Sequence, residues 1–95
     1  MARIRYTRHL RTRLEMRRFP EALPRIIFGE ADRRYRDRET GHFIAVKRVR
    51  LRRRERLVMI AYDQIGEGVE IVTMHPISEE QEASRVRGGR WNRTG

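Results

Sequence analysis

The stretch Leu-Val-Met-Ile-Ala-Tyr at residues 57–62 decides the fold of this 95-residue chain. None of its side chains is charged, whereas a strand with one solvated face alternates apolar and polar residues. A short run that is apolar throughout is typical of a central strand whose two faces are both covered. We therefore expect a sheet to form around residues 57–62.

Further strands are predicted on both sides of this run. Residues 33–38 and 43–51 alternate in polarity and are separated by the turn Glu-Thr-Gly at 39–41. A loop with two glycines at 63–68 leads into the extended segment 69–75. Short links of this kind favour antiparallel neighbours, because a parallel pair needs a long crossover.

Helices are predicted at both ends of the chain. Thr7 can cap a first helix that ends near Arg18, before a proline that excludes helical geometry from the preceding residue. A shorter second helix follows, with Gly29 at its C-cap. A serine at 78 and a glutamine at 81 resemble a capping box, which predicts an optional short helix over 78–86.

Together these elements predict an α+β domain. We expect an N-terminal two-helix hairpin packed on one face of a three- to four-stranded antiparallel sheet, with the optional C-terminal helix after it and all helices on one face of the sheet. The domain is assigned to residues 1–87 and a mobile tail to residues 88–95. Within that tail Trp91 either stacks on a base or anchors the segment by packing.

Several classes of protein are excluded by composition. The absence of cysteine rules out disulfides, cysteine zinc sites and thiol catalysis. No apolar run approaches the ~20 residues of a membrane span, and the N-terminus lacks the apolar segment of a signal peptide. The histidines and carboxylates show no ligand spacing, so we expect no metal site. We also expect no cofactor and no membrane partner. A soluble, cytoplasmic protein remains.

The charge is strongly positive and unevenly distributed. The formal net charge is +10, with 23 basic residues of which all but Lys47 are arginine. Residues 1–56 carry 19 basic and 7 acidic side chains, whereas residues 57–95 carry 4 and 6. A biased genome composition can explain arginine in place of lysine, but it explains the net charge less easily. The imbalance predicts a polyanionic partner, and nucleic acid is the commonest.

One basic patch is predicted around the turn between two strands. Its members are Arg48, Arg50, Arg52, Arg53, Arg54 and Arg56. We interpret it as a nucleic-acid-binding patch that contacts RNA phosphates, since a guanidinium binds phosphate through two N–H groups. The alternative is a solvated edge whose charges discourage aggregation between strands.

A second basic cluster lies on the first helix. His9, Arg13 and Arg17 follow one another at spacings of four residues, which aligns them along the helix. Two arginines beside a core need an anionic partner, and a phosphate is one candidate. In the alternative interpretation they pair with the chain's own carboxylates, of which the candidates are Glu15, Asp37 and Asp63.

The same residues offer the groups that metal-independent RNA cleavage requires. The reaction needs a base, an acid and cations that stabilise the phosphate; histidine suits the first two roles and arginine the third. The candidate catalytic set is His9, Arg13, Arg17, Tyr62 and His75.

The segment Tyr-Thr-Arg-His-Leu-Arg-Thr-Arg-Leu-Glu-Met-Arg-Arg-Phe at 6–19 resembles the opening of a bacterial and archaeal domain family of unassigned function. That family looks related to the RelE/ParE-like toxin superfamily, including the BrnT-like toxins. The likeness rests on a histidine with arginines four and eight residues later, and it continues through 32–37, 43–47, 57–62 and 69–76.

The resemblance implies two helices on an antiparallel sheet and kinship with toxins that cut RNA, often on the ribosome, or that inhibit other nucleic-acid machinery. The arginine-rich segment 51–56 and the chain after Pro76 depart from the family pattern. Catalytic residues vary widely within this superfamily, so no role is transferred to a position.

Three functions follow from these observations. The first is a toxin-like domain of a toxin–antitoxin system, acting as a metal-independent endoribonuclease on mRNA, with RNA and an acidic antitoxin protein as partners. The alternative is a non-catalytic RNA- or DNA-binding module that uses the arginine-rich face. The third is an accessory protein whose arginines meet a protein partner. The oligomeric state stays open.

Overall fold

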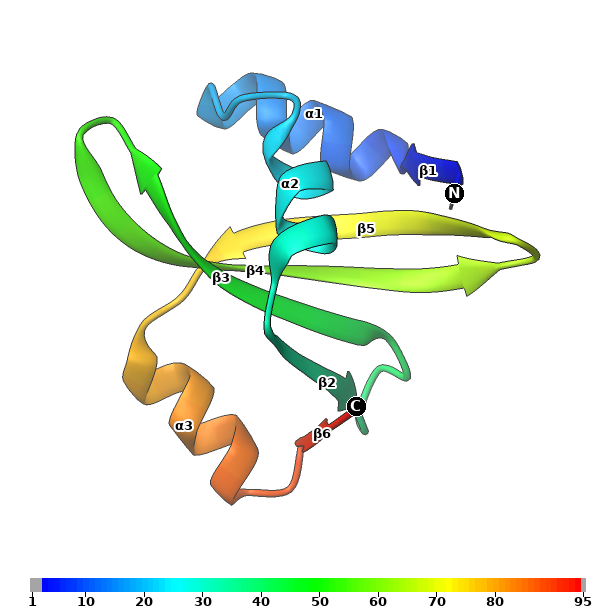
Figure 1. The fold of residues 1–95 in the computed structure, drawn as a ribbon, viewed down its shortest axis with the longest axis vertical. Helices are drawn as coiled ribbons and strands as arrows, with labels where there is room; N and C mark the ends of the chain where they lie inside the picture. The colour runs from blue at the N-terminus through cyan, green and yellow to red at the C-terminus, as the bar shows by residue number, and fades with distance from the viewer. Residues whose placement is uncertain (1–2, 95) are drawn as a thin grey trace.

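The computed structural model describes residues 3–94; residues 1, 2 and 95, the last assigned to the predicted tail, lie outside the described part. Figure 1 shows the order of the elements. They are β1 (Arg3–Tyr6), α1 (Arg8–Arg17), α2 (Leu23–Glu30), β2 (Arg33–Asp37), β3 (Phe43–Leu51), β4 (Arg54–Ile65), β5 (Gly68–Pro76), α3 (Glu79–Arg87) and β6 (Trp91–Arg93).

The strands form one mixed sheet of six, in the order β1-β5-β4-β3-β2-β6. β1 pairs with β5 in parallel, and every other pair is antiparallel. The predicted architecture, a helical hairpin on one face of a three- to four-stranded antiparallel sheet, is therefore wrong. It omitted both edge strands, because β1 and β6 are only 4 and 3 residues long and their partners lie far away in the sequence.

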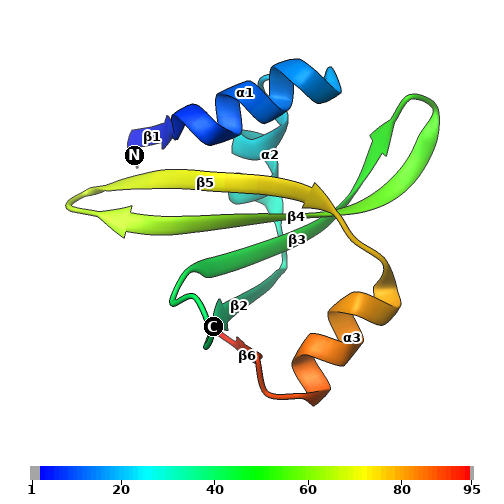
Figure 2. The same ribbon diagram turned by 180° about the vertical axis from the view of Figure 1, so that it is seen from behind.

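Two hydrophobic cores lie on opposite faces of the sheet. The first core packs α1 and α2 on the sheet and includes Leu10, Leu14, Ile27, Val49, Leu51, Val58, Ile60, Tyr62, Ile71 and Met74. The second core consists of Tyr35, Ile44, Val46, Leu57, Met59, Ala61 and Trp91. Residues 57–62 thus supply both cores, as their unbroken apolar run predicted. The predicted placement of all helices on one face is wrong, since α3 lies across the sheet from α1 and α2 (Figures 1 and 2).

The helix termini follow the local signals in the sequence. The Thr7 side chain accepts a hydrogen bond from the backbone N–H of Leu10 at 3.1 Å, so the predicted N-cap of α1 is confirmed. The helix ends at Arg18, which adopts the left-handed conformation at φ 55°. The capping box at Ser78 is confirmed too. α2 continues through Gly29 instead of ending there. Within residues 3–94, no helix is long and apolar enough to cross a membrane.

The C-terminal segment joins the sheet, in contrast to the mobile tail expected over 88–95. β6 pairs with β2, and Trp91 is only 2% exposed. The Trp91 ring stacks on Tyr35 with 5.4 Å between the centroids. Packing, not base stacking, therefore accounts for this tryptophan. Glu82 of α3 accepts a hydrogen bond from the Tyr35 hydroxyl at 2.6 Å, so α3 and β6 are attached at the same place.

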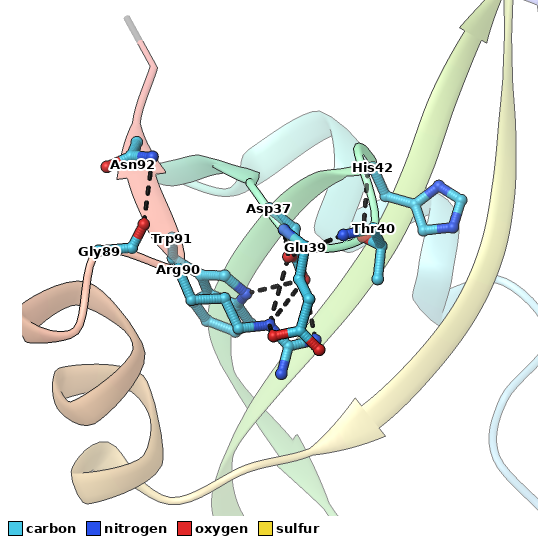
Figure 3. A network of polar contacts seen from close by, with 8 residues as sticks. All are labelled: Asp37, Glu39, Thr40, His42, Gly89, Arg90, Trp91 and Asn92. Atoms are coloured by element: carbon cyan, nitrogen blue, oxygen red, sulfur yellow. Dashed lines mark hydrogen bonds and ion pairs between the residues drawn. The ribbon is translucent and has the colours of Figure 1, made fainter.

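Asp37 holds this attachment together as a carboxylate that is 3% exposed. One carboxylate oxygen accepts hydrogen bonds from the backbone N–H groups of Glu39 at 2.8 Å and Thr40 at 3.2 Å. The other accepts one from Trp91 Nε1 at 3.2 Å, and Arg90 forms an ion pair with it at 3.2 Å. Figure 3 shows these donors converging on the carboxylate from the turn after β2 and from the C-terminal segment.

The ionised form of this carboxyl is strongly favoured. Burial alone would raise the pKa of Asp37, but hydrogen bonds from Arg90, from the backbone of Glu39 and Thr40 and from Trp91 lower it from 3.8 to about 2. Between these two values the unfolded chain binds a proton that the folded protein does not. Stability is therefore lost as the pH falls through this range.

We predict that Asp37→Asn removes this pH dependence. From pH 5 to pH 2 the free energy of unfolding of the unsubstituted protein should fall by about 2 kcal/mol more than that of the variant, because each pKa unit corresponds to about 1.4 kcal/mol. Urea unfolding followed by the fluorescence of Trp91, the single tryptophan, measures the difference. Parallel pH profiles for the two proteins would contradict the prediction.

Candidate functional site

The outer edge of β5 is covered by side chains of the chain leading into α1. β1 pairs with β5 only as far as Ile71, so the carbonyl groups beyond it lack a strand partner on that side. The Thr7 hydroxyl donates to the carbonyl of Val72 at 2.8 Å. Arg13 Nε donates to the carbonyl of Met74 at 2.9 Å. These bonds satisfy buried backbone acceptors and hold α1 along the strand.

Arg13 also fixes the tautomer of His75. Its Nη2 lies 2.6 Å from His75 Nδ1. A guanidinium only donates hydrogen bonds, so Nδ1 must be an unprotonated acceptor and the neutral ring carries its proton on Nε2. That nitrogen lies 3.2 Å from Thr73 Oγ1, to which it donates. Both ring nitrogens are therefore occupied within the protein.

The surroundings of His75 keep it neutral. Burial lowers the pKa of the imidazole, and the positive charges of Arg13, His9, Arg17 and Arg85 lower it further. Protonation would also place a second donor against Arg13. The group is therefore an uncharged imidazole at neutral pH, surrounded by cations on α1 and α3.

Four of the five predicted catalytic residues lie near one another, and Tyr62 lies apart from them. His9, Arg13 and Arg17 are close enough to His75 to shift its pKa. Tyr62 belongs to the first core, where its hydroxyl accepts a hydrogen bond from Arg34 at 3.2 Å. The strand partner of His75, by contrast, is Met59 of the second core, on the other face of the sheet.

The alternative in which the arginines of α1 pair with the chain's carboxylates does not hold. Asp37 binds Arg90, and Asp63 lies 2.8 Å from His42 Nδ1. Within residues 3–94 no carboxylate lies within ion-pair distance of Arg13 or Arg17. The helix therefore presents positive charge that the protein leaves uncompensated.

Three hollows in the surface of the described residues lie away from these cations. One is lined by residues of β1 and the β4–β5 turn, one by the segments around Arg38 and Arg90, and one by Arg11, Phe19 and their neighbours. His9, Arg13, Arg17 and His75 line none of these three. Over residues 3–94, no three histidine or carboxylate side chains gather as ligands for a metal ion.

The six predicted nucleic-acid-binding arginines lie on the β3–β4 hairpin and are all exposed. The two turn residues at its tip, Arg52 and Arg53, have left-handed φ values of 49° and 68°. The Arg52 guanidinium donates to the carbonyl of Arg17 at the end of α1 and lies 5.7 Å from the Phe19 ring. The hairpin tip is thereby attached to α1, and the two lie side by side in Figures 1 and 2.

The hairpin and α1 contact each other at the hairpin tip, and we term the arginines that these two segments bring together the basic track. Its members are Arg13, Arg17, Arg18, Arg52, Arg53, Arg54 and Arg56. In the described part of the chain none of them forms an ion pair with a carboxylate, whereas Arg48 pairs with Glu79 of α3. Sequence reasoning found both halves of the track but did not join them, because the contact between Arg52 and Arg17 spans 35 residues. Sequence reasoning also did not predict that Arg85 of α3 lies near His75, because no local pattern in α3 indicates this contact.

Comparison with known proteins adds no assignment. No family model, no curated protein and no solved structure matches this chain.

We predict that Arg13→Gln raises the pKa of His75. The substitution removes the nearest positive charge, while the glutamine amide keeps a donor for the Met74 carbonyl. Arg17→Gln serves as the matched control and should raise the pKa less, because Arg17 contributes less to the shift. NMR titration of the imidazole resonances measures both. If His75 titrates identically in R13Q and the unsubstituted protein, the contact does not exist in solution.

Proposed function

We propose that the protein binds nucleic acid, without cleaving it, through the basic track. The observation that carries the proposal is the conformation of the hairpin tip. Two-residue hairpin turns favour Asn-Gly or Asp-Gly, because both positions need a positive φ. Here both are arginines in the left-handed region, at φ 49° and 68°. Arginine at both positions therefore lowers the stability of the turn and places two positive charges at its tip.

The distribution of charge supports the same conclusion. Residues 47–56 contain seven basic side chains and one acidic one, Glu55. Such a density of like charges destabilises the folded protein unless a polyanion neutralises it. Phosphate groups suit this role because each guanidinium can donate two parallel hydrogen bonds. Residues that contradict the conformational preference of their position occur chiefly at functional sites.

A second candidate function is the toxin-like endoribonuclease, which would be neutralised by an acidic antitoxin covering the same track. One observation favours it: a neutral imidazole, His75, lies near three arginines, Arg13, Arg17 and Arg85. Its nitrogens would have to exchange their bonds to Arg13 and Thr73 for bonds to substrate. Incubation of single-stranded RNA and of ribosome-bound mRNA with the protein and with His75→Ala separates the two functions. Binding without cleavage supports the binding module, and cleavage that the variant lacks supports the nuclease.

We predict that Arg53→Gly stabilises the protein and weakens nucleic-acid binding. Glycine relieves the left-handed strain, which should raise the free energy of unfolding by about 0.5–1 kcal/mol. Loss of the tip charge should reduce affinity severalfold. Arg53→Lys, which keeps both the charge and the strain, is the control and should change neither quantity much. Thermal unfolding measures the change in stability, and fluorescence anisotropy with a labelled nucleic acid measures the change in affinity. Unchanged affinity in R53G would show that the hairpin tip does not contact the nucleic acid.

We also predict that the track determines the salt dependence of binding. Replacing Arg53, Arg54 and Arg56 by alanine should lower the slope of log affinity against log salt by about 2–3, since each phosphate contact contributes about 0.9 for duplex DNA. The matched control removes three exposed arginines elsewhere, Arg3, Arg25 and Arg93. Equal slopes for the two triple variants would mean that binding depends on net charge alone.

A further inference from the structure

The end of the β3–β4 hairpin extends beyond the sheet as a two-stranded ribbon. β2 pairs with β3 only as far as Val46, and β5 pairs with β4 only from Val58 onward. Beyond these points four cross-strand pairs, from Arg48 with Leu57 to Leu51 with Arg54, have no further strand on either side. At about 3.3 Å per residue the ribbon is about 13 Å long.

One face of this ribbon is fixed to the body of the protein. Val49 and Leu51 are 9% and 7% exposed and belong to the first core. The tip is bonded to the carbonyl of Arg17. The ribbon is thus supported from behind by α1 and α2 and presents its other face outward.

The outward face carries guanidinium groups, which donate hydrogen bonds, beside a carboxylate, which accepts them. Arg50 and Glu55 are directly opposite each other, and Arg48 follows on the same face. The side chains of Arg50 and Glu55 are both exposed, and no ion pair joins them. Nearby acidic side chains in the first turn of α3 are partly neutralised, because Arg48 pairs with Glu79 and Arg87 with Glu80.

The aromatic residues argue against a single-stranded ligand. Proteins that bind single strands stack bases on exposed aromatic rings. All seven aromatic side chains of this chain are packed in its cores: Tyr6, Tyr35, Tyr62 and Trp91 are buried, and Phe19, Phe28 and Phe43 pack against the first core. No stacking platform accompanies the arginines.

The dimensions of the ribbon distinguish between duplexes. The major groove of B-form DNA is about 12 Å wide and admits a two-stranded ribbon. The major groove of A-form RNA is too narrow for side chains to read. Arginine donates to the acceptors of guanine in the DNA groove, and glutamate accepts from the amino group of cytosine. Arg50 and Glu55 therefore match the two halves of a G·C pair.

We propose that the ribbon lies face-on in the major groove of duplex DNA, with Arg50 and Glu55 directed at a G·C pair. Arg52 and Arg53 at the tip, and Arg17 and Arg18 beside it, then contact the flanking phosphates. This assignment rests on the proposed nucleic-acid-binding function and names its ligand class.

The test compares the affinity of the full-length protein for four probes of equal length. They are a G·C-containing DNA duplex, the same duplex with 7-deazaguanine in place of guanine, the matching RNA duplex and the single DNA strand. The deaza substitution removes only a major-groove acceptor. We expect the natural DNA duplex to bind about tenfold more tightly than the other three, as one bidentate base contact predicts.

Variants locate the effect on the ribbon. Arg50→Ala should abolish the discrimination between natural and deaza DNA, whereas Arg3→Ala, with the same change in charge at the opposite end of β4, should preserve it. Glu55→Gln should also reduce the discrimination, although it removes a negative charge and so strengthens non-specific binding.

The outcomes are distinct. Tighter binding to the RNA duplex or to the single strand, or equal affinity for natural and deaza DNA, overturns the groove assignment while leaving the nucleic-acid-binding function in place. Absence of binding to all four probes overturns both.

Discussion

The burial of β4 on both faces is the constraint on which the rest of the structure depends. Leu57, Met59 and Ala61 enter the second core, while Val58, Ile60 and Tyr62 enter the first. A strand of this kind is stable only when both faces are covered. The N-terminal helices cover one, and α3 with the Trp91 strand covers the other. The C-terminal segment is therefore part of the fold, and the Asp37 carboxylate keeps it there.

The second constraint is the outer edge of β5, whose carbonyl groups beyond β1 are covered by side chains of Thr7 and α1. Arg13, a member of the basic track, donates to the Met74 carbonyl and contacts His75, so this arginine has a structural role as well. The helix that it holds ends at Arg17, whose backbone carbonyl accepts a hydrogen bond from Arg52 at the hairpin tip. The same contacts that protect a strand edge assemble a basic surface from segments far apart in the sequence. One helix thus carries both the contacts that hold the edge of the sheet and the arginines on which the proposed nucleic-acid binding depends.

Local signals in the sequence predicted the parts of the fold that depend on neighbouring residues. Thr7 and Ser78 cap their helices through side chains that reach only three residues along the chain, and turns separate the four central strands. Long-range pairing was not predictable in this way. Gly29 has the character of a helix terminator, yet α2 continues to Glu30 because packing of Ile27 in the first core outweighs that preference. Tyr62 and His75, grouped by their chemistry, were separated by strand register and by the alternation of faces.

What the sequence determined by itself was the sign and density of charge, the central strand and the helix caps, since each depends on composition or on contacts within one turn. The tertiary structure alone decided that β1 joins β5 in parallel, that Trp91 is an anchor, and that the arginines of α1 and of the hairpin form one surface. These outcomes depend on contacts between residues 35 to 65 positions apart. Such contacts leave no periodic pattern in the chain, because the residues that form them lie far apart in the sequence and meet only in the folded protein.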